Sequence, residues 1–266
     1  MYQDIGELRA FYDTPLGRVT RRLIQRQITA LWHNISGMDI VGLGYAAPYL
    51  DIFRSRSKHG AKHGAKHVIN IMPALQGVTR WPRHNGDLGN DGPHPYKGNL
   101  TALAHDGNLP LKDASIDRIL VIHTLEHTEV SRHLLREIWR SLAPGGRVII
   151  IVPNRLGLWA RTDRTPFGHG TPFSALQLRQ LLSENMLTPT QTTSALHLPP
   201  FKSRSLLSLM TTFEGTGQRW WHNLAGALIV EAEKQIYATG PKIKARKRAP
   251  QPAIAGNHMD SKKYNN

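Results

Sequence analysis

The stretch Asp39-Ile40-Val41-Gly42-Leu43-Gly44-Tyr45-Ala46-Ala47-Pro48 joins a short apolar run to a Gly-x-Gly sequence and then to the start of a helix. In α/β proteins the first strand turns into the first helix in this way, and backbone N–H groups at the turn face a ligand. Glycine suits such a turn because a side chain would block the ligand's approach to the backbone. The stretch therefore predicts a first strand at 39–43, followed by a ligand-binding turn.

The composition is typical of a soluble globular protein. Of the 266 residues, 40% are hydrophobic and 20% are charged, which is enough for one α/β domain with a large core. The absence of cysteine excludes a disulfide scaffold and a cysteine nucleophile. We expect a cytoplasmic protein without a membrane span, because no apolar run has the length of one and the first residues lack a secretory pattern.

The net charge of +15 at pH 7 is large and makes nucleic acid one candidate partner. Part of this charge lies in residues 241–266, a basic tail that we expect to be disordered. A further part lies in residues 58–67, a tandem repeat rich in lysine and histidine that is typical of a duplicated loop. A solvated tail and a solvated loop are favoured over a nucleic-acid surface.

Hydrophobic periodicity divides the rest of the chain into alternating strands and helices. Residues 8–32 have the pattern of an amphipathic helix interrupted by Pro15 and Gly17, so residues 1–36 are expected to form a helical cover. The further predicted strands are 68–72, 99–104, 116–122, 147–152, 191–197 and 226–236, and the further predicted helices are 48–56, 128–142, 174–184 and 203–213. This alternation predicts an α/β domain over 37–240, with a mostly parallel sheet and helices on both faces.

Four segments match one protein family in order: 43–46, 104–111, 115–127 and 134–147. They resemble, respectively, the family's glycine-rich motif, its Gly-Asp-Ala-x-x-Leu-Pro-Phe segment, its fourth strand with a Leu-Glu-His ending, and its helix and turn before strand five. Together they resemble the class I S-adenosylmethionine-dependent methyltransferases, in the type 11 group that includes quinone-biosynthesis enzymes. The resemblance implies a Rossmann-like seven-stranded sheet, mostly parallel with the last strand antiparallel, and S-adenosyl-L-methionine as the cofactor.

The resemblance also implies which residues would hold this cofactor at the carboxyl ends of the first strands. The glycine turn would face its methionine part, Asp106 would accept a hydrogen bond from the adenine amino group, and the segment after Asp106 would lie beside the ring. The implied cofactor-binding residues are Gly42, Gly44, Tyr45, Ala46, Asp106, Gly107 and Leu109.

The sequence departs from the family at both acidic positions. The residue two places before the family's first glycine is Gly42, and Ala46 and Pro48 replace its later glycines. The carboxylate that ends strand two and holds the ribose hydroxyls is replaced by Met72, which cannot accept those hydrogen bonds. Asn70 or a residue of the loop 86–91 is the candidate substitute.

His123 ends the predicted fourth strand, where the resemblance would put it near the transferred methyl group. Methyl transfer depends mainly on positioning, and a base is needed only where the acceptor must lose a proton. His123 is therefore the candidate catalytic residue, and a structural role at the strand end is the alternative. Glu126 and His127 are expected to cap or brace the following helix. With His123 they would lack a fourth metal ligand, so we expect no metal site.

The segment 155–173 is long and follows strand five, at the edge where loops commonly carry function. Arginines there could hold a carboxylate or phosphate, and aromatic side chains could form apolar walls. The candidate substrate-binding residues are Arg155, Trp159, Arg161, Arg164, Phe167 and His169. Alternatively, the arginines pair with Asp163, Glu126 or Glu137 and pin the loop.

Three functions therefore remain open. The leading hypothesis is transfer of a methyl group from S-adenosyl-L-methionine to a small or medium-sized acceptor, anionic acceptors included. The second, motivated by Gly42 and Met72, is a catalytically inactive binding or regulatory protein with the same fold. The third, motivated by the net charge, is an RNA methyltransferase or RNA-binding protein.

Overall fold

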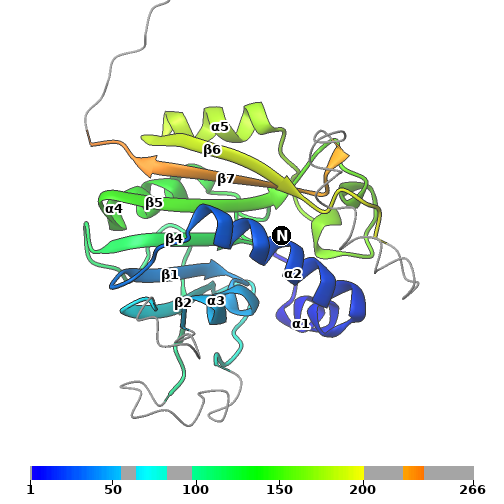
Figure 1. Cartoon of the computed structure of the whole chain (residues 1–266), viewed down its shortest axis with the longest axis horizontal. Helices are drawn as coiled ribbons and strands as arrows, with labels where there is room; N and C mark the ends of the chain where they lie inside the picture. The colour runs from blue at the N-terminus through cyan, green and yellow to red at the C-terminus, as the bar shows by residue number, and fades with distance from the viewer. Residues whose placement is uncertain (1, 55–63, 83–97, 201–223, 237–266) are drawn as a thin grey trace, which may run out of the picture. The chain divides into compact units, whose positions relative to one another are not determined.

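A computed structural model describes residues 2–54, 64–82, 98–200 and 224–236 (Figure 1). These residues belong to a compact unit that spans residues 1–236. Most of the Lys-His repeat, the loop 86–91, the predicted helix 203–213 and the basic tail lie outside the described residues.

Seven strands form one sheet within the described residues, in the order β3-β2-β1-β4-β5-β7-β6. Neighbouring strands are parallel except that β7 runs antiparallel to both β5 and β6. This confirms the predicted sheet, including the antiparallel last strand. The strands are β1 (Asp39–Gly44), β2 (His67–Pro73), β3 (Thr101–Ala104), β4 (Ile116–Ile122), β5 (Leu142–Pro153), β6 (Leu187–Ala195) and β7 (Ala227–Lys234).

Helices cover both faces of this sheet (Figure 1). Successive strand residues point to opposite faces, so Ile40 packs in the core cluster under α2 and α3, whereas Val41 packs in the cluster under α4 and α5. The helices are α1 (Ile5–Asp13), α2 (Pro15–Leu31), α3 (Ala47–Arg54), α4 (Ser131–Ser141) and α5 (Ala175–Glu184), with short 3-10 turns η1 (Trp159–Arg161) and η2 (Pro166–Gly168).

The predicted interruption of the N-terminal helix lies at Thr14, between α1 and α2. The Thr14 hydroxyl accepts a hydrogen bond from the Gly17 backbone N–H at 2.9 Å, and Pro15 occupies the first turn of α2, as favoured at helix starts. A Cβ on Gly17 would lie 2.1 Å from the Phe11 carbonyl oxygen. The glycine therefore lets α1 fold back closely against α2.

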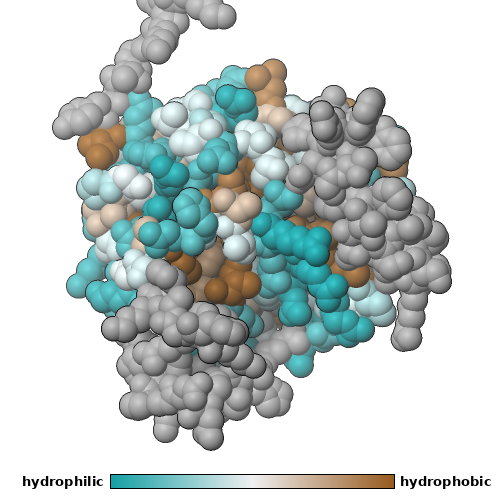
Figure 2. All heavy atoms as spheres, viewed as in Figure 1, coloured by the Kyte–Doolittle hydropathy of each residue, from teal (hydrophilic) through white to brown (hydrophobic). Residues whose placement is uncertain are grey.

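The outer face of α2 carries part of the basic charge of the chain. Its exposed arginines are Arg18, Arg21, Arg22 and Arg26, and Figure 2 shows a hydrophilic band over this helix. At its end, the Trp32 indole Nε1 donates to Glu231 Oε1 at 3.0 Å. Glu231 lies on β7 and is fully buried, so a buried hydrogen bond ties the N-terminal helices to the last strand.

The segment around Pro144-Gly145-Gly146 differs from its prediction. Helix α4 begins at Ser131 rather than Thr128 and ends at Ser141, and β5 begins directly at Leu142 rather than at Arg147. Leu142 already pairs with Ile116 on β4, and the register then shifts before Arg147 pairs with Arg118. The Pro-Gly-Gly sequence therefore lies in a bulge within a longer strand.

Among the described residues, no helix has the length and apolarity needed to cross a membrane.

Candidate active site at the carboxyl edge of the sheet

The turn after β1 is packed tightly against the end of β4. Gly44 has φ +82°, and a Cβ there would lie 1.9 Å from Thr124 Oγ1 and 2.3 Å from the Ile122 carbonyl oxygen. The Tyr45 N–H donates to the same Ile122 oxygen at 3.2 Å. Gly42 lies within β1, and its Cβ would come within 2.7 Å of Ala46 Cβ. Packing alone therefore requires both glycines, and Tyr45 and Ala46 are fully buried.

Asp106 lines a cavity of about 180 Å³ beyond the ends of β2 and β3. Ala74, Leu75 and Val130 contribute apolar surface to it. A dry protein cavity of about 150 Å³ can hold a benzene ring, so this volume suits a flat aromatic ring. The Tyr2 hydroxyl donates to Asp106 Oδ2, and burial together with this carboxylate raises the pKa of Tyr2. The cavity thus combines apolar walls with two acidic residues, Asp106 and Glu129.

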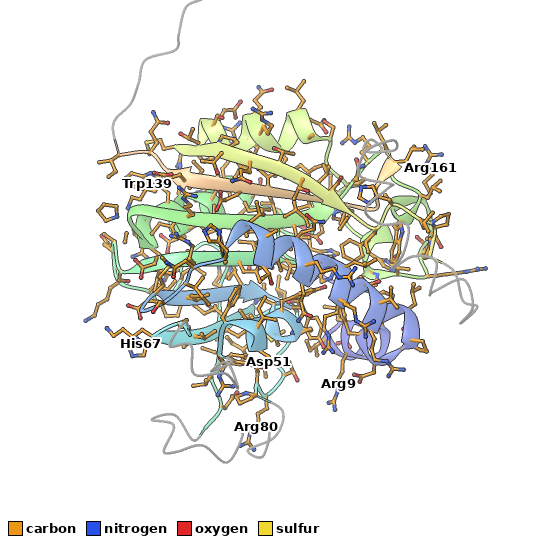
Figure 3. The ribbon with its side chains drawn as sticks, viewed as in Figure 1. Arg9, Asp51, His67, Arg80, Trp139 and Arg161 are labelled. Atoms are coloured by element: carbon orange, nitrogen blue, oxygen red, sulfur yellow. The ribbon has the colours of Figure 1, made fainter. Side chains whose placement is uncertain are left out.

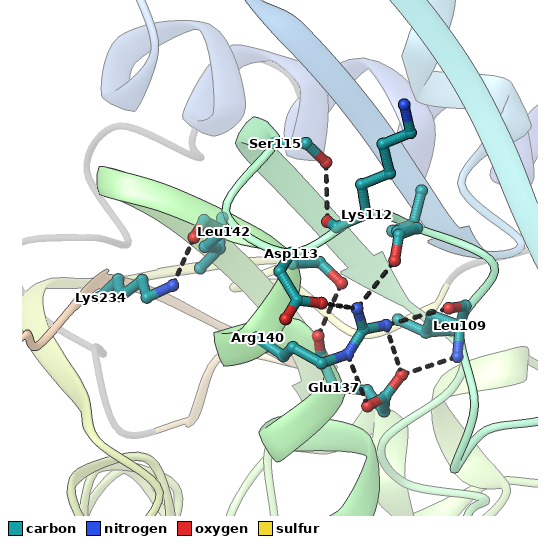
Figure 4. Close-up of polar contacts among 10 residues, drawn as sticks. Leu109, Lys112, Asp113, Ser115, Glu137, Arg140, Leu142 and Lys234 are labelled. Atoms are coloured by element: carbon teal, nitrogen blue, oxygen red, sulfur yellow. Dashed lines mark hydrogen bonds and ion pairs between the residues drawn. The ribbon is translucent and has the colours of Figure 1, made fainter.

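The segment that carries Asp106 is held to α4 by an Arg-Glu pair (Figure 4). Glu137 Oε2 accepts from the Leu109 N–H at 2.9 Å, and Arg140 donates to the carbonyl oxygens of Leu109 and Leu111 at 3.0 and 2.8 Å. The hydrogen bonds from Arg140 hold the pKa of Glu137 below its ordinary value. Leu109 is buried in the core, whereas the half-buried Gly107 donates its N–H to His105 Nδ1 at 3.2 Å.

His123 lies at the end of β4 in a strained conformation. Its φ is +54°, which is uncommon outside glycine and frequent at functional sites, and its side chain is fully buried. Its Nε2 is 2.8 Å from the Tyr12 hydroxyl, which is also 2.8 Å from the Tyr49 hydroxyl. Burial raises the pKa of both tyrosines, so both phenols stay protonated. The Phe167 ring packs edge-on against the imidazole, with centroids 5.1 Å apart.

Glu126 contacts His123 rather than capping the next helix. Its Oε1 is 3.4 Å from His123 Nδ1, and its Oε2 accepts from the Thr124 N–H at 3.1 Å. The residue that precedes α4 is Val130, without a side-chain cap. The expectation that Glu126 and His127 cap this helix is therefore wrong, while the alternative that they brace it stays a prediction. The cause is that α4 begins at Ser131, which leaves Glu126 free to turn back toward the strand end.

Gln76 reaches this site although sequence reasoning did not select it. It follows β2 in a turn closed by its own N–H to the Pro73 oxygen at 2.9 Å. Its Nε2 donates to the backbone oxygen of His123 at 2.8 Å, and 1% of the residue is exposed. The available signal was a polar residue close to the end of an apolar strand. Met72 at that strand end is fully buried, as is Asn70, whose side chain lies beside Gly42.

In the loop after β5, the aromatic candidates for substrate binding are buried, whereas the arginine candidates are exposed. Trp159 and Phe167 are buried, and the Trp159 Nε1 donates to the Leu198 oxygen at 2.7 Å. Arg155, Arg161 and Arg164 are exposed, and Figure 3 shows Arg161 at the end of the molecule opposite His67 and Trp139. Phe167 therefore joins His123, whereas the arginines remain on the surface.

The alternative pairing of these arginines is not what the structure has. Arg155 donates to the Pro172 oxygen at 3.3 Å, Glu126 lies against His123, and Glu137 pairs with Arg140. Neither Arg161 nor Arg164 forms an ion pair with any residue in the described part of the chain. His169, half-buried, lies 3.0 Å from the Asp163 oxygen through its Nε2.

Comparisons with known proteins agree with this fold. A methyltransferase domain family model matches residues 57–150. A relative from Mycolicibacterium smegmatis, described as a probable S-adenosylmethionine-dependent methyltransferase, is 28% identical over 127 residues, which cover 48% of this chain and 43% of the relative. The aligned part thus spans less than half the length of this curated relative.

Solved methyltransferase structures share the architecture at low sequence identity. A S-adenosylmethionine-dependent methyltransferase from Thermotoga maritima has a TM-score of 0.58 and 14% identity, covering 87% of this chain and 96% of its own. One from Aquifex aeolicus has a TM-score of 0.54 and 15% identity, covering 87% and 98%. Together with the strand order, they show that the described residues have the fold of S-adenosylmethionine-dependent methyltransferases.

Proposed function

We propose that the protein transfers a methyl group from S-adenosyl-L-methionine to a small or medium-sized acceptor. The observation that carries the proposal is the arrangement at one sheet edge: the Asp106 cavity, the buried imidazole of His123, and Gln76, which follows the cavity-lining Leu75 and donates to the His123 backbone oxygen. The acceptor itself is left as a class, and the exposed arginines of the loop after β5 make anionic acceptors candidates.

The residues present fit the adenine end of the cofactor. The cavity walls at Leu75 and Val130 suit a flat ring, and Asp106 supplies an acceptor for an exocyclic amino group. Among described residues, a buried polar atom without a hydrogen-bond partner also remains at this edge, Gln76 Oε1. Such atoms are costly unless a ligand or water satisfies them. The bound cofactor would supply an electrophilic methyl group on a sulfonium.

His123 would handle the acceptor's proton. The Glu126 carboxylate beside Nδ1 favours the tautomer with hydrogen on Nδ1, which leaves Nε2 as an acceptor. In the structure Nε2 faces the Tyr12 hydroxyl, so it can hold a hydroxyl group by hydrogen bonding. An acceptor hydroxyl or ammonium at this position would be oriented by Nε2 and could give its proton to it.

Calorimetry with S-adenosylhomocysteine tests the proposal. We expect the folded wild-type protein to bind it, and Asp106→Ala to weaken binding by about tenfold or more, because a hydrogen bond to a charged group contributes roughly 1.5–3 kcal/mol. Glu184→Ala is the control, since this exposed carboxylate on α5 pairs with Arg132 on α4. Absence of binding to well-folded wild type would refute the function, and an unchanged affinity in Asp106→Ala would refute the role of Asp106.

A further inference from the structure

The ribose of the cofactor must lie between two groups that the structure locates. If the adenine occupies the Asp106 cavity and the methyl group lies near His123, the sugar that joins them lies between these points. Gln76 occupies this interval: Ala74 and Leu75, which precede it directly, line the cavity, and its side chain reaches the His123 backbone. This inference rests on the proposed function, because it assumes that cofactor.

The orientation of the Gln76 amide is fixed by its partner. The His123 backbone oxygen can only accept a hydrogen bond, so the amide NH₂ must face it, at 2.8 Å. The other amide atom, Oε1, is buried and has no hydrogen-bond partner among the described residues. A buried carbonyl oxygen without a donor costs free energy. Gln76 Oε1 is therefore a fixed hydrogen-bond acceptor that the donor group of a ligand can satisfy.

Met72 cannot meet the same need. It lies at the end of β2, is fully buried and offers no strong acceptor. Asn70 is also buried, but its amide oxygen lies beside Gly42 within the sheet, 2.9 Å from the position a Cβ would take there. Gln76 is therefore the polar side chain that extends past the strand end toward His123.

We propose that Gln76 Oε1 accepts a hydrogen bond from a ribose hydroxyl of the bound nucleoside and so replaces the missing strand-two carboxylate. A neutral amide forms weaker hydrogen bonds than a carboxylate. The Gln76 amide would also couple the ribose to the backbone of His123, because its oxygen would contact the sugar and its NH₂ group contacts the His123 oxygen.

The test compares adenosine with 2′,3′-dideoxyadenosine, which lacks both ribose hydroxyls, by calorimetry or NMR titration. Gln76→Leu should weaken adenosine binding by about two- to tenfold, the range of one neutral hydrogen bond, and should leave dideoxyadenosine binding within about twofold. Asp106→Ala should weaken both nucleosides alike, because its contact is with the base. Asn185→Leu is the matched control, since the buried Asn185 Nδ2 also donates to a backbone oxygen, that of Leu181 at 2.7 Å, at the end of α5.

The outcomes separate the two proposals. If wild type binds neither nucleoside nor S-adenosylhomocysteine, the proposed function fails. If wild type binds adenosine but Gln76→Leu weakens both nucleosides equally, Gln76 only holds the His123 backbone in place, and the inference is overturned. An unchanged adenosine affinity overturns it as well.

Discussion

Gly44 and Gly145 both have a positive φ, but of these two only Gly44 is also closely packed. Gly44 has φ +82° and would place a Cβ within 2.3 Å of two atoms of β4 and its following turn, whereas Gly145 has φ +71° with no described atom within 4 Å. A left-handed conformation costs an L-residue about 1–2 kcal/mol. At Gly145 this conformational cost is the whole cost of adding a Cβ, whereas at Gly44 the cost of overpacking against Thr124 and Ile122 is added.

We expect Gly145→Ala to lower the free energy of unfolding by about 1–2 kcal/mol and Gly44→Ala by roughly 3 kcal/mol or more. Urea denaturation of both variants measures the difference. Equal losses would show that the end of β4 can move aside for a Cβ, and that the tight turn is not a constraint of this fold.

Three residues at the candidate site, His123, Glu126 and Gln76, show what the sequence could and could not predict. His123 could be assigned to the site because it directly follows an apolar strand, and strand ends share one edge in a parallel sheet. Glu126 was misassigned because a carboxylate near a helix start resembles a cap, and the true start at Ser131 is shifted by a few residues. The contact of Gln76 with His123 could not be predicted, because it crosses β1 and depends on register, which periodicity does not encode.

At the scale of elements, α4 controls the segment that carries Asp106. Glu137 and Arg140 hold the backbone at Leu109 and Leu111 (Figure 4). Because the folded pKa of Glu137 is lower than its ordinary value of 4.5, its ionised form stabilises the fold. That stabilisation is complete above the unfolded pKa and is lost as pH falls below 4.5 through the folded pKa.

We expect Glu137→Gln to lower the free energy of unfolding by about 1 kcal/mol near pH 7, because the pair is partly solvated. The difference from wild type should shrink as pH falls below 4.5. Urea titrations at several pH values measure it, with Glu184→Gln as the control for an exposed pair. A difference that stays constant across this range would mean that Glu137 acts through packing rather than through charge.

The elements were predictable where a local pattern and the tertiary structure agree. Strand 116–122 and helix α5 were predicted closely because their apolar periods match the buried faces. The break between α1 and α2 followed from Pro15 and Gly17. The early start of β5 was not predictable, since Pro-Gly-Gly favours a turn and the pairing of Leu142 with Ile116 is a long-range contact.

At the scale of the whole molecule, the N-terminal segment contacts both ends of the candidate site. Tyr2 bonds Asp106, and Tyr12 on α1 bonds His123. These two contacts occupy groups that the proposed ligands would use. Ligand binding and the position of the N-terminal segment should therefore be coupled.

Tyr2→Phe tests this coupling. Loss of the hydroxyl frees Asp106 as an acceptor, so we expect S-adenosylhomocysteine to bind about two- to tenfold more tightly. In the Asp106→Ala background the same substitution should have no effect, since the competing contact is already gone. Weaker binding in Tyr2→Phe would instead mean that the Tyr2 hydroxyl contributes to the ligand site.

The hydrogen bond from Trp32 to Glu231 has a consequence for folding while the chain is being synthesised. Its partners are 199 positions apart in the chain, and Glu231 lies on β7, which pairs with both β5 and β6. A ribosome releases the N-terminal helices long before it has made that strand. Until then α2 lacks this hydrogen bond and β5 is paired only with β4, so one edge of the sheet stays unpaired during synthesis. The fold closes only when its last strand arrives.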